Sequence, residues 1–271
     1  MFQLKKIRLF WWSEPNLMGK TKENYGDLLG SYLVQKISNR NVIWTHPKRW
    51  HIMGYFVPIY VTIGSVLAHV NSKCVVWGSG IISKDQTVKS AKFLAVRGPL
   101  TRQNLLSQGH DVPKIYGDPA LLLSRYYNPI VDKKYSYGIV SHYVDYDNVC
   151  KLFSGIDDIL IIDLMTTNIE KTTRLFLKCD RILSSSLHGI IVSHAYQIPA
   201  VWIEFSDKLF GDGIKFQDYF ESLKIPTYKP FRVLSLKDLN QITQDFEIYP
   251  SSPKKDRLKI IQDELLAVCP F

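Results

Sequence analysis

Three consecutive serines followed by Leu187 and His188 are the part of this sequence best suited to chemistry. Ser184, Ser185 and Ser186 come after a strand-like segment and before an apolar, helix-like one. A helix that begins directly after a strand leaves its first N–H groups unpaired beside the positive end of the helix dipole, so the junction can bind an anion. His188, whose side chain ordinarily titrates near neutral pH, is predicted to stand beside this anion site.

Arg97 is a second candidate for holding an anion. It ends an apolar segment and is followed by Gly98 and Pro99, and proline is favoured at the first position of a helix. The planar guanidinium can hold a carboxylate or a phosphate through two charge-assisted hydrogen bonds, which a lysine cannot reproduce. The alternative interpretation is a surface arginine beside the start of a helix.

Three further polar residues follow strand-like segments and could bind a sugar. Asn24 and Asp27 flank Gly26 ahead of an amphipathic helix, and Asp118 lies between a glycine and a proline. Asparagine and aspartate are common helix caps, so capping is one interpretation. The other is hydrogen bonding to sugar hydroxyls at the carboxyl ends of strands, where open α/β sheets bind ligands. The sequence leaves both open.

Several familiar site patterns are missing. His188 and His194 are separated by about 600° along a helix at roughly 100° per residue, so they lie on different faces. No carboxylate completes a zinc pattern with them, and we expect no metal site. The glycines at 78 and 80 lack the third glycine of a dinucleotide fingerprint, and neither a Walker loop nor a GxSxG motif occurs.

The segments that must position these residues alternate between apolar strands and amphipathic helices, which predicts an α/β fold with parallel sheets. We expect strands at residues 6–12, 42–44, 61–65, 74–78, 93–97, 114–117, 137–141, 159–164, 181–184 and 200–205. We expect helices at residues 25–38, 99–107, 146–153, 169–179, 187–196, 236–246 and 253–268.

A polar stretch at residues 124–134 interrupts this alternation and is expected to link two halves. We therefore predict one doubly wound domain over residues 1–125 and a second over residues 126–250, facing each other across a cleft. Residues 251–271 would form a helix that packs on the outside or back on the first domain.

The composition is that of an ordinary globular protein. The 271 residues are 46% hydrophobic, enough for a sizeable core, and the formal net charge is +9 with the histidines neutral. Such a charge favours anionic partners, but the basic residues are scattered and no nucleic-acid recognition motif accompanies them, so we expect no nucleic-acid binding. Four cysteines without a CxxC pair and the lack of a secretory leader favour a reduced, cytoplasmic protein.

Residues 55–70 contain no charged side chain apart from a protonated His69, and this stretch falls short of the roughly 20 residues that cross a bilayer. We interpret it as buried strand and helix. Together with the basic charge, it leaves peripheral contact with the anionic inner face of a membrane as an open alternative.

In their order along the chain, these motifs resemble the polysaccharide pyruvyl transferase family. The resemblance covers about residues 24–223. It is carried by NYGD at 24–27, GSG at 78–80, RGPLT at 97–101, GDPALLL at 117–123, SSSLHGIIVSHAY at 184–196 and KFQDYFESL at 215–223.

The resemblance implies two Rossmann-like domains in a GT-B-like arrangement. It also implies transfer of the pyruvyl group of phosphoenolpyruvate to a pair of sugar hydroxyls, giving a pyruvate ketal during bacterial-type polysaccharide biosynthesis. Phosphoenolpyruvate would be a co-substrate, no further cofactor is expected, and the glycan acceptor would be free, nucleotide-linked or carried on polyprenyl phosphate. His188 matches the family's catalytic histidine, and Arg97 matches the arginine that grips the donor.

One position departs from the family pattern. Many relatives carry an arginine immediately before Leu-His, where this chain has Ser186. The donor would then be held by N–H and hydroxyl groups of Ser185, Ser186 and Leu187, with Lys215 supplying the missing charge. Asn24, Asp27 and Asp118 are the candidates for binding the acceptor.

Two other functions stay open at this stage. A GT-B-like glycosyltransferase that uses a nucleotide-sugar donor would share the predicted architecture. A non-catalytic glycan-binding protein would be compatible with the missing arginine.

Overall fold

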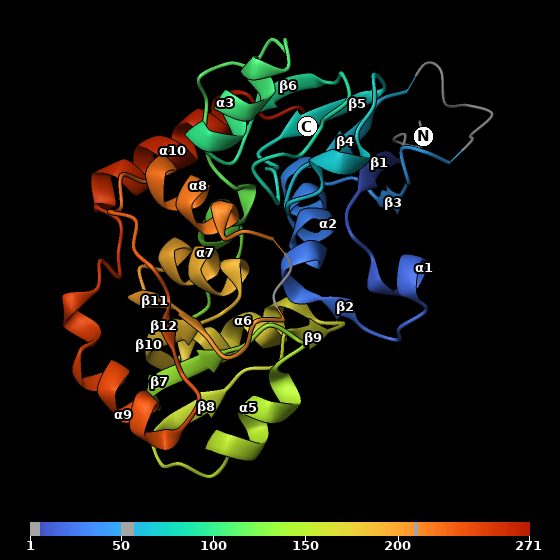
Figure 1. The fold of residues 1–271 in the computed structure, drawn as a ribbon. Coiled ribbons are helices and arrows are strands. Elements are labelled where there is room, and N and C mark those ends of the chain that lie inside the picture. The colour runs from blue at the N-terminus through green and yellow to red at the C-terminus, as the bar shows by residue number, and fades with distance from the viewer. Residues whose placement is uncertain (1–5, 50–56, 209–210) are drawn as a thin grey trace.

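Two parallel five-stranded sheets form the framework of the protein, which a computed structural model describes over residues 6–49, 57–208 and 211–271 (Figure 1). The strands of the first sheet lie in the order β3 (Val42–Trp44), β1 (Ile7–Phe10), β4 (Ile59–Val61), β5 (Cys74–Trp77) and β6 (Lys92–Ala95). Those of the second lie in the order β12 (Phe231–Arg232), β11 (Ala200–Glu204), β10 (Cys179–Ser184), β7 (Tyr135–Val140) and β8 (Ile159–Ile161).

Both sheets have the same strand order. When the five strands of each sheet are numbered along the chain, the order is 2-1-3-4-5 in each, which is one of the two common doubly wound arrangements. The direction of winding reverses between β1 and β4 in the first sheet and between β7 and β10 in the second. The predicted α/β class is confirmed, and each half has a Rossmann-like topology.

Helices flank both sheets. They are α1 (Glu14–Met18), α2 (Tyr25–Ser38), α3 (Pro99–Ser107), α4 (Leu123–Tyr126), α5 (Tyr146–Phe153), α6 (Ile169–Leu177), α7 (Leu187–Ala195), α8 (Ile214–Ser222), α9 (Leu236–Gln244) and α10 (Lys255–Ala267). Short 3-10 turns occur at η1 (Leu67–His69), η2 (Pro119–Leu122) and η3 (Phe246–Ile248). The bounds predicted for α2, α3 and α5 are confirmed.

Several predicted bounds are wrong. The strand expected at 61–65 is β4, which ends at Val61, and the chain turns at Gly64 with a φ of +101°. The segment 114–117 contributes only a bridge between Val96 and Tyr116. The helix expected to reach 179 ends at Leu177, and Cys179 opens β10. The first residues of the expected linker belong to α4.

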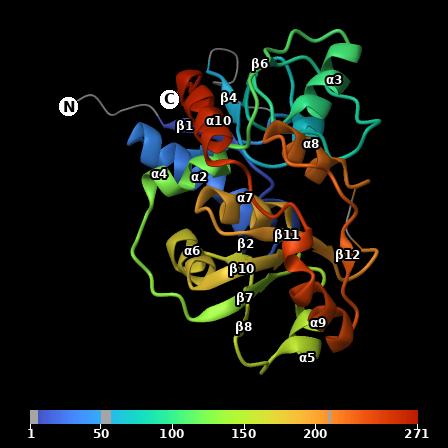
Figure 2. The same cartoon turned by 90° about the vertical axis from the view of Figure 1, so that its left-hand side faces the viewer.

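The two halves share a core. Apolar residues of α2, η2, α6 and α7 pack into one cluster, and Figures 1 and 2 show α2 and α7 between the two sheets. A short antiparallel pair, β2 (Glu23–Asn24) with β9 (Met165–Thr166), also joins the halves. Helix α8 packs on α3 of the first half, so segments from both halves surround the space between the sheets.

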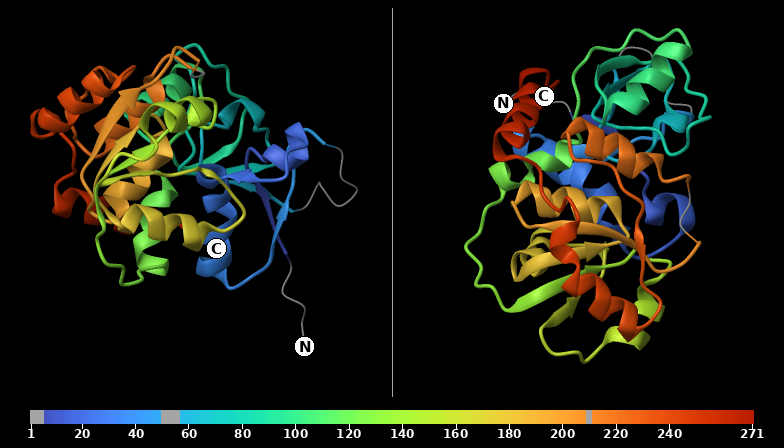
Figure 3. Two further views of the ribbon diagram at one scale, coloured as in Figure 1. Left: turned by 90° about the horizontal axis from the view of Figure 1, so that it is seen from below. Right: turned by 60° about the vertical axis from the view of Figure 1, so that its left-hand side comes forward.

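The last helix returns to the first half. Helix α10, red in Figure 3, packs against η2, and the indole Nε1 of Trp77 donates a hydrogen bond to the Leu265 carbonyl at 2.9 Å. The ring of Phe271 packs against Tyr60 and Trp77. No helix among the described residues is long and apolar enough to cross a membrane; residues 55 and 56 of the apolar stretch lie outside the described residues.

Candidate active site

The serine junction forms the strand-to-helix turn that the sequence predicts. The Ser184 hydroxyl accepts from the Ser186 N–H at 3.0 Å, and the Ser185 hydroxyl accepts from the His142 N–H at 3.0 Å. Ser186 occupies the N-cap of α7, where its hydroxyl makes no cap hydrogen bond with the described part of the chain. Ser184 and Ser185 therefore brace the turn, while the Ser186 hydroxyl and the first N–H groups of α7 are left for a ligand.

His188 lies where α7 meets α2. Its side chain is only 13% exposed, and its ring sits so close to Gly26 that a Cβ there would be 2.0 Å from Nδ1. Any residue other than glycine at position 26 would displace the ring. The glycine of the NYGD motif thus makes room for His188, a contact that neither interpretation of the motif foresaw.

Asp118 both caps a turn and faces His188. Its Oδ1 accepts from the Ala120 N–H at 2.9 Å, and its Oδ2 lies 3.8 Å from His188 Nε2. Both Oδ2 and Nε2 are buried, and neither has a hydrogen-bond partner within the described ranges. Buried polar atoms are rarely left unpaired, so this pair is a strong candidate for function.

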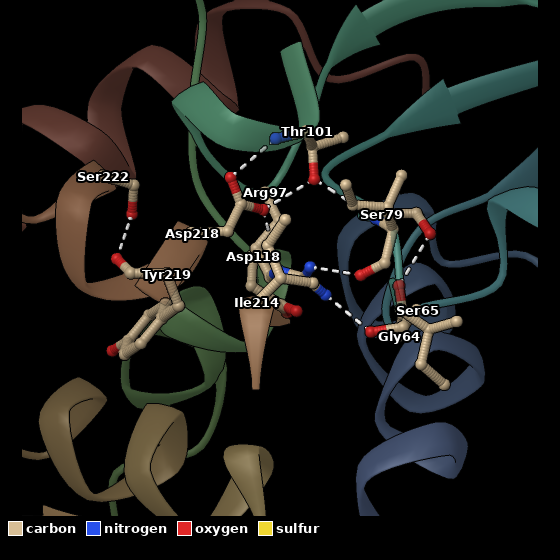
Figure 4. A network of polar contacts seen from close by, with 12 residues as sticks. Gly64, Ser65, Ser79, Arg97, Thr101, Asp118, Ile214, Asp218, Tyr219 and Ser222 are labelled. Carbon is tan, nitrogen blue, oxygen red and sulfur yellow. Dashed lines mark hydrogen bonds and ion pairs between the residues drawn. The ribbon is translucent and has the colours of Figure 1, made fainter. Parts of the chain in front are cut away.

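Arg97 is completely buried, and the alternative of a surface arginine is wrong. Its Nε donates to Asp218 Oδ2 at 3.1 Å, while its two terminal nitrogens donate to the Ser65 hydroxyl and to the Ile81 carbonyl, both at 2.6 Å (Figure 4). To grip a donor with its planar edge, the guanidinium would have to give up these bonds. The predicted donor contact of Arg97 is not visible in this arrangement and stays a prediction.

Asp218 is the partner that sequence reasoning missed. It also accepts from the Thr101 N–H at 2.9 Å and from the Thr101 hydroxyl at 2.6 Å, and it is fully buried (Figure 4). Asp218 lies 121 positions after Arg97 in the sequence. A carboxylate among the buried aromatic residues of α8 was the one available signal, because a buried charge requires a partner.

Asp27 and Lys215 are two buried titratable groups that influence each other. Asp27 Oδ1 would lie 3.3 Å from a Cβ at Gly64. Burial raises the pKa of Asp27 to about 8, with a further contribution from the nearby Glu14. Burial and the charge of Arg97 lower the pKa of Lys215 to about 8, against the effect of Asp27. The two side chains influence each other, so one carboxyl and one amine share this part of the site.

The histidines of the site are held neutral at neutral pH. Burial, followed by the charges of Arg97 and Lys215, lowers the pKa of His188 to about 3. Burial raises the pKa of Asp118 to about 7, although the Ala120 N–H and the Arg97 charge oppose this rise. His142, at the end of β7, has a pKa lowered to about 4 by burial and by Lys215. The positive charges of Arg97 and Lys215 thus add to the effect of burial at the imidazole of His188, and such charges suit an anionic ligand.

A cavity of about 190 Å³ opens beside Lys215. Its walls are formed by Trp202, Glu204, Ser206, Asp207, Gly211, Gly213, Lys215 and Phe216, at the carboxyl end of β11 and the start of α8. Asn24, in contrast, is used as a cap: its Oδ1 accepts from the Gly26 N–H at 3.0 Å. Among the described residues there is no cluster of three or more histidine, cysteine, aspartate or glutamate side chains that could hold a metal ion.

The model of the polysaccharide pyruvyl transferase family matches residues 24–207, more than half of the chain. The protein belongs to the polysaccharide pyruvyl transferase family. It is therefore an enzyme of this transferase family, and the matched range contains Asp27, Arg97, Asp118 and His188. Lys215 and Asp218 lie beyond that range.

A relative of this pyruvyl transferase comes from Acanthamoeba polyphaga mimivirus, where it is described only as an uncharacterized protein. The two sequences are 30% identical over 239 residues, which is 84% of this chain and 80% of the relative. The similarity extends over both halves of the fold.

Proposed function

We propose that this protein transfers the pyruvyl group of phosphoenolpyruvate to a pair of sugar hydroxyls and so forms a pyruvate ketal on a glycan. The observation that carries the proposal is the placement of His188, an imidazole at the contact between the two Rossmann-like halves with the charges of Arg97 and Lys215 nearby. Family membership supports pyruvyl transfer and does not favour the nucleotide-sugar alternative. The meeting of the halves supports a GT-B-like use of the space between them.

The donor's phosphate and carboxylate would bind at the beginning of α7. Its first N–H groups and the Ser186 hydroxyl are available, and the helix dipole favours an anion there. Lys215 adds a charge, in place of the arginine that Ser186 replaces. Arg97 contributes mainly through its field, because its hydrogen bonds are made to the protein.

His188 would carry out four proton transfers in turn, one to a carbon atom of the donor and three to or from oxygen atoms. As imidazolium it protonates the methylene carbon of the donor, which leaves a cationic centre at the neighbouring carbon. The neutral ring then accepts the proton of the first hydroxyl as its oxygen bonds to that centre. It returns this proton to the phosphate as the carbon–oxygen bond breaks, and it accepts the proton of the second hydroxyl as the ketal ring closes. General acid–base catalysis of this kind is typically worth about 10²–10⁴-fold.

Donor binding has to precede the first of these steps. With a pKa of about 3 in the empty site, His188 is neutral at neutral pH. The negative charges of phosphoenolpyruvate would raise this pKa because they oppose the fields of Arg97 and Lys215. The site would then become protonated only when the substrate that needs the proton is bound.

The acceptor sugar would occupy the cavity beside Lys215. Glu204, Ser206 and Asp207 provide oxygen atoms that can accept from sugar hydroxyls, and the two carboxylates would repel the anionic donor from this end. Asp27, from the first half, would accept from a hydroxyl of the reacting pair. Asn24 is already engaged as a cap.

The test is an assay with purified protein, phosphoenolpyruvate and a galactose-containing acceptor, offered both free and linked to a polyprenyl phosphate. We expect release of phosphate and a pyruvyl mass on the acceptor. His188→Ala should abolish turnover and Lys215→Met should raise KM for the donor, whereas Lys237→Met, on the exposed face of α9, should change neither. Transfer only from a nucleotide sugar would overturn the proposal.

A further inference from the structure

Asp118 and His188 each bury one polar atom that the fold leaves unpaired. Oδ2 of Asp118 and Nε2 of His188 lie 3.8 Å apart, and each lacks a hydrogen-bond partner among the residues described. A small rotation of the ring would bring them within hydrogen-bond distance. We infer that Asp118 is a positioning residue, which keeps a proton on Nε2 of His188 and thereby presents Nδ1 to the reactants. This inference rests on the proposed function.

The carboxylate has little freedom of its own. Asp118 is 1% exposed, and it stands at the N-cap of η2, followed by Pro119, whose φ is fixed by its ring. The Ala120 N–H holds Oδ1 at 2.9 Å. With one oxygen fixed in this way, the other is directed at His188. Above its pKa of about 7 the Asp118 carboxyl is ionised, and an ionised carboxylate can only accept a hydrogen bond.

The imidazole is fixed from the other side. Gly26 closes off the ring face beside Nδ1, because even a methyl group at that position would overlap the ring. Nε2 is buried, so the exposed 13% of the side chain belongs to its other atoms. The tautomer with hydrogen on Nε2 therefore satisfies Asp118 and leaves a lone pair on the nitrogen that reactants can approach.

This arrangement assigns separate tasks to the two nitrogen atoms. Nδ1 gives a proton to the methylene carbon, takes one from the first hydroxyl, returns it to the departing phosphate and takes one from the second hydroxyl. The hydrogen on Nε2 stays in place throughout, and the negative charge of Asp118 stabilises the imidazolium each time it forms. In serine hydrolases, an aspartate behind a histidine sets the tautomer in the same manner.

Asp118→Asn tests the inference. The amide oxygen can still accept from the Ala120 N–H, but the amide nitrogen would then face Nε2 and donate to it, which moves the ring hydrogen to Nδ1. We expect kcat to fall by about 10²–10⁴-fold, with KM for donor and acceptor changed by less than about threefold. A kcat within about threefold of the parent enzyme would overturn the inference.

A second measurement does not depend on activity. Nitrogen-15 NMR of the unliganded protein, recorded at a pH above the pKa of Asp118, should show the hydrogen of His188 on Nε2 in the parent and on Nδ1 in Asp118→Asn, with the resonance assigned by its loss in His188→Gln. Asp145 is the matched control, because it also has one oxygen held, by Ser206, and one without a partner in the described chain. Asp145→Asn should leave the His188 resonances unchanged.

The two measurements separate the two proposals. If the expected tautomers are found but no phosphoenolpyruvate is consumed, the proposed function fails and the role of Asp118 as a positioning residue for that reaction fails with it, although the geometry of the pair holds. If turnover is found but the parent ring carries its hydrogen on Nδ1, the inference alone is overturned. Asp118→Ser, which keeps a capping hydroxyl and removes the second oxygen, should fold and show a mixture of tautomers.

Discussion

Arg97 with Asp218 and His188 with Asp118 are two buried acid–base pairs that join distant parts of the chain, and they differ in how completely they are hydrogen-bonded. The carboxylate of Asp218 accepts from Arg97 and from both donors of Thr101, and the arginine has two further acceptors. The second pair leaves an atom of each partner unpaired. A saturated pair has no capacity left for a ligand, so it fixes the fold, whereas an unsaturated pair keeps capacity for exchanging protons.

The comparison also explains how the halves depend on each other. Asp218 lies on α8 in the second half of the chain and holds Arg97, two residues after β6, in the first. Arg97 in turn lowers the pKa of His188 and of Lys215. The saturated pair thus holds a positive charge close to the unsaturated pair. We expect substitutions in the saturated pair to lower mainly the stability, and substitutions in the unsaturated pair to lower mainly the turnover.

The largest effect on stability should come from breaking the saturated pair. Arg97→Ala leaves the carboxylate of Asp218 buried without its countercharge, which typically costs about 3–5 kcal/mol. Urea denaturation measures the loss. Arg181 and Glu247 form the matched control, because this ion pair has a similar distance of 2.9 Å but exposed partners, and Arg181→Ala should cost at most about 1 kcal/mol. Equal losses for the two variants would contradict the comparison.

Gly26→Ala should damage the unsaturated pair while the fold survives. The new methyl group would lie 2.0 Å from the position of Nδ1 and displace the His188 ring from its place beside Asp118. A misplacement of this size can cost about 10²-fold in turnover. Alanine is up to about 1 kcal/mol better than glycine inside a helix, which offsets part of the strain. In a His188→Ala background the same change should have no further effect on rate; a second large loss there would place the damage elsewhere.

The pH dependence of stability should show that His194 is a structural residue, unlike the titratable residues of the candidate active site. His194 is buried, with Nδ1 2.9 Å from the Tyr219 hydroxyl and Nε2 3.0 Å from the Ser251 carbonyl. Burial lowers its pKa to about 4, below the ordinary value of 6.5. Its contribution to stability is complete above pH 6.5 and is lost as the pH falls toward 4. His194→Gln should therefore lose about 1–2 kcal/mol less than the parent between pH 7 and pH 4.5.

Asp27 should make stability depend on pH in the direction opposite to that of His194. Its folded pKa of about 8 is above the ordinary value of 3.8, so the folded protein binds this proton more tightly and loses stability as the pH rises from about 4 toward 8. Asp27→Asn should remove that loss. Denaturation midpoints measured across the same pH range for both variants check the two signs together, and curves that shift in the same direction would refute the assignment.

Substitutions at two helix caps should have the smallest effects on stability. Ser186 caps α7 without a side-chain hydrogen bond in the described chain, so Ser186→Ala should change stability by less than about 0.5 kcal/mol. Asn24 caps α2 through its side chain, and Asn24→Ala should cost about 1 kcal/mol. If Ser186 binds the donor, the first variant raises KM for phosphoenolpyruvate all the same. An unchanged donor KM would assign the anion site to backbone N–H groups and Lys215.

Local features of the fold were predictable because their causes are local. The bounds of α2 and α3 follow from an N-cap at Asn24 and a proline at position 99, and both helices begin where expected. Strand ends were predicted less well. A strand was expected to include Gly64, but its positive φ turns the chain there, and an apolar run alone does not report that angle.

What the sequence by itself determined is the ordered set of motifs, the alternation that makes two parallel sheets, and the placement of His188 just after a strand. These depend on residues within a few positions of one another. Only the tertiary structure decided that Arg97 is saturated by Asp218, that Gly26 seats the ring of His188, and that Asp118 faces its Nε2. Partners far apart in sequence meet only after both sheets have packed, and the shifts in pKa follow from the loss of water at that contact.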